Sequence, residues 1–195
     1  MKRFLVFILS AALLAPLNVL AATYTLDPFH STIQFRVKHL MIANVTGAFE
    51  KFKGTVVIDE KDITKSKVDV SIEMASLNTA IGKRDEHLRS PDFFDVAKFP
   101  VMTFVSTKVE RAGTDKLKVT GNLTIKGVTK PAVLAVDGPT GEITSPQGDV
   151  KRGASATAKI NRQDFGVSWN KKLDGGGVVV ADDVFIMIDT EMARQ

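Results

Sequence analysis

The sequence contains no cysteine, and this absence removes several kinds of chemistry at once. Without thiols the chain forms no disulfide, thiolate zinc site or iron–sulfur cluster, and it has no cysteine nucleophile. The GxSxG, HExxH, GxGxxG and P-loop motifs are also missing. Three histidines, His30, His39 and His87, are the candidates for imidazole chemistry. The sequence therefore favours a protein that binds a ligand over an enzyme.

The chain also lacks a strong charge of one sign. It has 26 Lys and Arg against 22 Asp and Glu in 195 residues, and the two signs are interspersed. This distribution excludes the basic patch that is typical of nucleic-acid binding. With 44% hydrophobic residues and no linker or repeat, the composition is that of one folded domain.

One long hydrophobic run is present, and it lies at the N-terminus. A positively charged start is followed by an apolar run from Phe4 to Leu20 and then by Ala21 and Ala22. This pattern predicts a secretory signal peptide, residues 1–21, and a mature domain, residues 22–195. The alternative is a retained membrane anchor, for which the run is short and is interrupted by a proline and an asparagine.

Beyond this run, apolar and polar residues alternate with period two. The alternation is clearest from Lys67 to Met74, and it recurs from Ile33 to Lys38 and from Leu117 to Ile125. A period of two is typical of half-buried β-strands. Further strands are expected at residues 45–58, 101–109, 132–136, 154–160 and 184–190. The sequence therefore predicts an all-β domain of about eight antiparallel strands.

One segment breaks the alternation. Residues Asn78 to Arg89 predict a short polar helix, and Ser90 with the following proline predicts the N-cap of a further single turn through Phe93 and Phe94. The helix contains the densest group of ionisable residues in the chain. This group either meets an anionic head group or forms a solvated helix face.

Strand lengths alone suit a barrel and a two-sheet sandwich equally. Small residues give a hint, because Ala154, Ala156 and Ala158 share one face of a strand and Gly121 interrupts the apolar face of another. Such residues either leave room for a ligand, which an eight-stranded barrel can hold, or pack against a large neighbour such as Phe104. The pattern leaves both interpretations open.

The histidines do not suggest a metal site. His30 and His39 are nine residues apart, so an unbroken strand would point them to opposite faces. We therefore expect neither a metal nor a cofactor other than the bound ligand itself.

Several segments, in order along the chain, carry a resemblance to a known family. They are Leu26–Ser31, Phe35–His39, Val45–Phe49, Arg84–Val96, Phe99–Pro100, Phe104–Ser106, Gly121–Pro131 and Asn161–Gly166. Together they resemble the YceI-like family over nearly all of the mature chain. The resemblance implies an extended, lipocalin-like, eight-stranded antiparallel β-barrel with a short helical insertion. It further implies export to the periplasm and a long isoprenoid lipid, a polyisoprenoid or an isoprenoid quinone, as the ligand inside the barrel.

The resemblance and the apolar pattern together select candidate ligand-binding residues. For the apolar cavity these are Phe35, Val37, Phe49, Phe93, Phe94, Phe104, Leu123, Ile125 and Phe165. For a polar head of the ligand we predict His87 and Arg89, near a mouth of the barrel. The same charged motif would otherwise anchor the insertion against the barrel.

The predicted function is sequestration or transport of this lipid, with no nucleic acid as a partner. The alternative hypothesis is an enzyme that acts on an isoprenoid or a stress metabolite with His39 or His87 as general base. Transient contact with a membrane and a homodimer are further expectations for its partners.

Overall fold

The structure is a computed structural model, and it describes residues 21–195. The predicted signal peptide lies outside the described residues, apart from its last residue, Ala21. Among residues 21–195, no helix combines the length and the apolar composition needed to cross a membrane.

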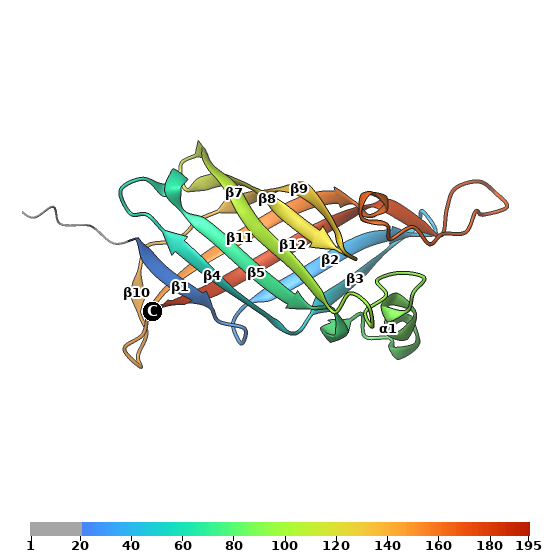
Figure 1. The fold of residues 1–195 in the computed structure, drawn as a ribbon, viewed down its shortest axis with the longest axis horizontal. Helices are drawn as coiled ribbons and strands as arrows, with labels where there is room; N and C mark the ends of the chain where they lie inside the picture. Colours follow the sequence, from blue (N-terminus) through green and yellow to red (C-terminus); the bar gives the residue numbers. More distant parts are fainter. Residues whose placement is uncertain (1–20) are drawn as a thin grey trace, which may run out of the picture.

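The described chain is built mainly of strands, with one α-helix and three short 3₁₀ helices (Figure 1). The elements are β1 (Ala22–Leu26), β2 (Thr32–His39), β3 (Ala43–Phe49), β4 (Phe52–Ile58), η1 (Ile63–Lys65), β5 (Lys67–Glu73), η2 (Met74–Ser76), β6 (Leu77–Asn78), α1 (Gly82–Arg89), β7 (Val101–Gly113), β8 (Lys116–Ile125), β9 (Val128–Asp137), β10 (Ile143–Thr144), β11 (Val150–Asn161), η3 (Arg162–Phe165) and β12 (Val180–Arg194).

Eight strands form a closed antiparallel ring. In order around the wall they are β1, β4, β5, β7, β8, β9, β11 and β12, and β12 pairs again with β1. Closure leaves these strands without a free edge along their paired length. The prediction of an eight-stranded, lipocalin-like barrel is confirmed, and the two-sheet sandwich is excluded.

The barrel is extended because one strand changes its partner. The last strand, β12, pairs with β2 from Val180 to Asp189 and then with β1 from Met192 to Arg194. β2 and β3 thereby lengthen the wall beyond β1 and β4, towards the end of the barrel that carries α1 (Figure 1).

The single strand expected at residues 45–58 is broken in two. β3 pairs with β2 and β6, whereas β4 pairs with β1 and β5, so the chain must shift between partners at Glu50 and Lys51. Both backbone N–H groups there donate to Ser76, one to its carbonyl oxygen and one to its Oγ. The backbone N–H groups at the break are therefore bonded to a residue that is distant in sequence. Period-two alternation does not indicate such a contact.

The predicted N-cap at Ser90 is wrong. Ser90 Oγ donates to the carbonyl oxygen of His87 at 2.8 Å, so this residue ends α1 and begins no new helix. Residues 91–94 form turns instead of a helical turn. The helix itself is confirmed but starts at Gly82, because residues 77–78 pair with β3 as β6.

The core follows the alternation of the strands. In β8 the side chains of Leu117, Val119, Leu123 and Ile125 are buried, and those between them face outward or are partly exposed. The strand face that the apolar residues occupy is thus the inside of the barrel, as the sequence predicts. β1, which is not among the predicted strands, follows the same rule and buries Tyr24 completely.

Candidate functional site

The barrel encloses an apolar cavity of about 250 Å³. Its lining comes from every strand of the ring, together with β2, β3, α1 and η3. Ile58 and Met192 line it near β1, and Leu88 and Phe165 line it at the opposite end, beside α1. The cavity therefore follows the long axis of the barrel.

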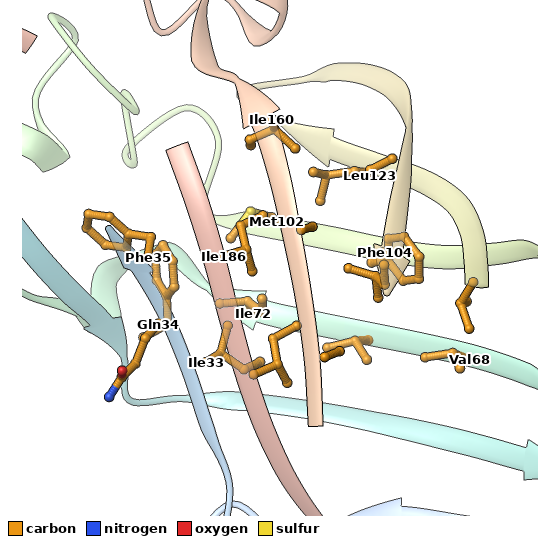
Figure 2. A pocket seen from close by; sticks show the side chains of 18 of the residues that line it. Ile33, Gln34, Phe35, Val68, Ile72, Met102, Phe104, Leu123, Ile160 and Ile186 are labelled. Carbon is orange, nitrogen blue, oxygen red and sulfur yellow. The ribbon is translucent and has the colours of Figure 1, made fainter. Parts of the chain in front are cut away.

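The lining offers very few polar groups. Figure 2 shows Ile33, Ile72, Met102 and Ile186 among the apolar lining side chains, and the amide of Gln34 points away from the other labelled side chains. The remaining polar lining residues are Ser66, Ser155, Arg162 and Thr190. A cavity of this kind holds an apolar molecule by removing its surface from water, at about 25 cal/mol per Å².

All nine residues predicted for the apolar cavity lie in its lining. They are Phe35, Val37, Phe49, Phe93, Phe94, Phe104, Leu123, Ile125 and Phe165. They come from β2, β3, β7, β8, η3 and the turns after α1, so the fold brings together residues that are far apart in sequence. Their contact with a ligand stays a prediction.

The small residues of the strands have two different roles. Ala154, Ala156 and Ala158 line the cavity, where their short side chains leave it open. Gly121 instead makes room for an aromatic ring, since a Cβ atom at this position would overlap Cζ of Phe104. Small residues therefore leave room in the cavity on β11, and on β8 a small residue packs against a large neighbour.

The two residues predicted for a polar head lie outside the lining. The His87 ring meets Phe93 and Trp169 edge-on, with ring centroids 5.0 and 5.1 Å apart, and its Nε2 lies 3.0 Å from Oδ2 of Asp92. Because Phe93 does line the cavity, His87 is one side chain removed from the cavity. Its role at a ligand head stays a prediction.

The charged motif of α1 anchors the insertion to the barrel. Arg89 Nη2 donates to the carbonyl oxygen of Leu77 on β6. The buried carboxylate of Asp85 accepts from the backbone N–H and the hydroxyl of Thr79, while Arg84 donates to the hydroxyl and the carbonyl of the same threonine. These bonds fix the helix over one end of the cavity.

Arg162 is a lining residue that is not among the predicted site residues. Its guanidinium is buried and lines the cavity, yet all five of its N–H groups have partners within the protein. They donate to the carbonyl oxygens of Val167, Trp169, Val180 and Ala181 and to Asp182 Oδ1. Burial lowers the pKa of Arg162, and Asp182 opposes this. Arg162 fastens the loop between η3 and β12 to the barrel. The one feature of the sequence that could have indicated its role is its position in the family-like segment 161–166.

A hydrogen-bonded network lies at the opposite end of the barrel. Tyr24 donates to Glu142 Oε1 at 2.5 Å and accepts from Arg152 Nε at 2.9 Å, and Arg152 also pairs with Glu60. Burial and the hydrogen bond to Glu142 raise the pKa of Tyr24. The network ties the segment that carries Glu142 to β1.

A second polar cluster lies at the turn between β1 and β2. His30 Nδ1 is 2.8 Å from Asp27 Oδ2, and the Lys151 ammonium lies 3.3 Å from Asp27 and 2.6 Å from Glu191. The hydrogen bond from His30 is the largest cause that lowers the pKa of Asp27 to about 2. His39, at the far end of β2, takes no part in this cluster.

A closed antiparallel barrel around an elongated apolar cavity defines a lipocalin-like barrel. Within that class, the model of the YceI-like domain matches residues 24–192. The chain belongs to the YceI-like family.

Individual relatives agree with this assignment. The chain is 40% identical to Protein YceI of Salmonella newport over 169 residues, which are 86% of this chain and 87% of that protein. The crystal structure of BcnA from Burkholderia cenocepacia superposes with a TM-score of 0.73 at 26% identity, covering 85% of this chain and 98% of BcnA. A polyisoprenoid binding domain from Saccharophagus degradans, at 17% identity and a TM-score of 0.63, covers 90% of this chain and 99% of that domain and shares the fold.

Proposed function

We propose that the protein binds one long isoprenoid lipid, a polyisoprenoid or an isoprenoid quinone, inside the barrel and sequesters or carries it through water. The observation that carries this proposal is the apolar cavity along the barrel axis. The name of the Saccharophagus relative, which shares the fold, supports the class of ligand. The predicted leader, outside the described residues, supports the periplasm as the compartment.

The lining determines how such a ligand would be held. Each buried CH₂ group contributes about 0.8 kcal/mol, so a chain of many carbons binds tightly with few polar contacts. Discrimination between chain lengths would come from the shape of the cavity and would be weak for each added carbon. We therefore expect several isoprenoids to bind and the physiological ligand to be the most available one that fits.

The nine lining residues named above form the ligand surface in this proposal, and His87 and Arg89 lie nearest to a polar head. His87 contacts Phe93, so a small shift of that ring would expose the imidazole to the cavity. Arg89 donates from Nη2 to the Leu77 carbonyl, while its buried Nε–H has no partner among the described residues and remains a donor for a head group.

The first experiment is mass spectrometry of the intact protein after gentle purification, followed by organic extraction of the released ligand. One isoprenoid lipid per chain is expected. An empty protein that also takes up neither isoprenoid quinones nor polyprenyl phosphates would contradict the proposal.

A matched pair of variants tests whether the cavity holds the lipid. Ala156 lines the cavity, whereas the next residue, Thr157, is exposed on the outer face of β11. Ala156→Phe fills the cavity and should lower lipid occupancy by at least about tenfold, and Thr157→Phe adds a ring outside and should leave occupancy unchanged. Thermal unfolding of both variants checks that each is folded.

The same preparation separates binding from catalysis. If His87 contacts a polar head, His87→Gln lowers affinity for quinones more than for a hydrocarbon of equal length. The enzyme alternative requires instead that purified protein converts the extracted lipid and that His39→Ala or His87→Ala abolishes the conversion while lipid retention survives.

A further inference from the structure

The hairpin between β2 and β3 ends in an unusual turn. Ile42 N–H donates to the His39 carbonyl at 3.1 Å, and the two central residues, Leu40 and Met41, have φ angles of 49° and 61°. Positive φ at both central positions defines a type I′ turn, for which Asn-Gly is strongly preferred. Leu and Met disfavour this conformation, because their Cβ atoms crowd the backbone there. The turn is therefore built from residues that do not favour its own folding.

The same residues are exposed to solvent. Leu40, Met41 and Ile42 are 37%, 49% and 79% exposed, and we call these three residues the apolar tip. Three consecutive apolar side chains at the end of a hairpin are unfavourable in water. A strained turn that also exposes apolar surface points to contact with something outside the barrel.

The apolar tip lies at the end of the barrel that carries α1. Val37 and Val180 line the cavity, and three residues after Val37 the Leu40 N–H donates to the Val179 carbonyl at 2.8 Å. The loop before β12 thus runs beside the tip, and both project from the same end of the barrel (Figure 1). The apolar tip therefore lies on the outside of the barrel, at the end where Val37 and Val180 line the cavity.

Three lysines lie on the segments that adjoin the apolar tip. Lys38 precedes it on β2, and Lys171 and Lys172 lie on the adjoining loop, where Lys172 pairs with Val178. All three are exposed, and the loop carries one acid of its own, Asp174.

The acids on the adjoining part of β12 have partners of their own. Asp182 accepts from Arg162, and Asp183 pairs with Lys159 at 2.6 Å. The surroundings of the apolar tip thus have a surplus of positive charge, which complements an anionic surface.

We infer that the apolar tip inserts into the surface of an anionic phospholipid membrane, with Lys38, Lys171 and Lys172 against the head groups. Exposed apolar side chains with lysines on the adjoining segments match the two layers of such a surface, an apolar interior and negatively charged heads. This contact brings the α1 end of the cavity to the bilayer. The idea that a lipid enters or leaves the cavity at this contact rests on the proposed function. The membrane contact itself is inferred from the apolar tip and its lysines alone.

The test measures flotation of the purified mature protein with vesicles of about equal parts phosphatidylglycerol and phosphatidylcholine. Leu40→Asn with Met41→Gly gives the turn its preferred residues, so this variant should melt at the same temperature as the parent or higher while its vesicle partitioning falls at least about tenfold. A loss of binding is then separated from a loss of folding. Ile143→Ser is the matched control, because Ile143 is 64% exposed on β10, at the other end of the barrel.

Replacing Lys38, Lys171 and Lys172 by Gln tests the charge. Partitioning should weaken about fivefold for each lysine, and both added salt and vesicles of phosphatidylcholine alone should weaken it in the parent protein. Lipid content, measured in the same samples by mass spectrometry, distinguishes the two proposals. A protein that floats but contains no lipid, and that takes up neither isoprenoid quinones nor polyprenyl phosphates, overturns the lipid-carrier proposal alone.

Two results would overturn the inference. One is a lipid-loaded parent protein that does not float, or that floats as well after the tip is changed. The other is a dimer, detected by sedimentation velocity, that the tip variant abolishes while its flotation stays unchanged. In that case the apolar tip would contact a second copy of the chain.

Discussion

The aromatic ring of Phe35 lies directly on Gly47, its cross-strand partner on β3. A Cβ atom at position 47 would overlap Cζ of this ring. The Phe35 ring therefore packs flat against the wall of the barrel at β3. Phe104 and Gly121 show the same arrangement on β7 and β8. Glycine in these strands keeps large rings out of the middle of the cavity.

Gly47→Ala should therefore reduce lipid binding. Alanine normally stabilises a strand relative to glycine by about 0.5–1 kcal/mol, but here its methyl group pushes the Phe35 ring towards the cavity. We expect lipid occupancy to fall several-fold by mass spectrometry. A Cβ atom at position 47 would also lie 2.8 Å from Cγ2 of Thr79, so Phe35→Leu and Thr79→Ser together with Gly47→Ala should restore it, and Gly141→Ala, where no neighbour lies within 4 Å, is the control. Unchanged occupancy in the single variant would refute this role of glycine.

Tyr24→Phe should destabilise the barrel without altering its cavity. The hydroxyl bonds both Glu142 and Arg152, and its loss leaves Arg152 Nε without an acceptor beside a fully buried ring, whereas Glu142 keeps its bond from Arg194. The expected cost is about 1–3 kcal/mol, which lowers Tm by roughly 2–12 °C for a chain of this size. Calorimetry measures it. A variant with the Tm of the parent would show that the network contributes no net stability.

Stability should fall in acid through Asp27. Its pKa in the folded protein is about 2, below the ordinary 3.8, because His30, the Phe29 N–H and Lys151 donate to its carboxylate. The carboxylate therefore stabilises the fold fully above about pH 4 and progressively less as the pH falls towards 2. Asp27→Asn should lose at most about 2 kcal/mol at neutral pH. Urea unfolding at several pH values tests this: the difference between parent and variant must shrink below pH 4, and a constant difference would contradict it.

Ligand binding should change the fluorescence of Trp169, the only tryptophan of the sequence. Its ring lies 5.1 Å from that of Phe93, which lines the cavity, and 5.1 Å from that of His87. Titration with an isoprenoid quinone should quench or shift the emission to saturation at one ligand per chain. Ala156→Phe should require far more ligand. If extraction shows that the protein is saturated with ligand and the emission of Trp169 is nevertheless unchanged, the ligand must lie away from Phe93.

Much of the barrel and its lining could be predicted because alternation records which face of a strand is buried. For Phe35, Val37, Leu123 and Ile125, alternation indicates the buried face and the family-like segments indicate the cavity, whose lining contains all four. The family-like segments then decided between a barrel and a sandwich, which alternation alone could not.

Other features depend on partners that are distant in sequence. The break at Glu50 requires Ser76, and Arg89 faces Leu77 instead of the cavity because α1 folds back onto β6. Ser90 carries the same N-cap signal whether it begins a helix or ends one. The turn at Leu40 contains none of the residues that predict its conformation, so only the backbone angles identify it.

The changing partners of β12 have a consequence for the order of folding. β12 pairs with β1, β2 and β11, so the last strand joins the first to the rest of the wall. During synthesis the N-terminus of the chain emerges first, so the ring cannot close until β12 is available. Until then β1 and β11 keep unpaired edges that can pair with other chains. Closure through such distant segments is slow. The nascent barrel is thus most prone to aggregate just before its final strand docks, and it would gain most from a chaperone at that moment.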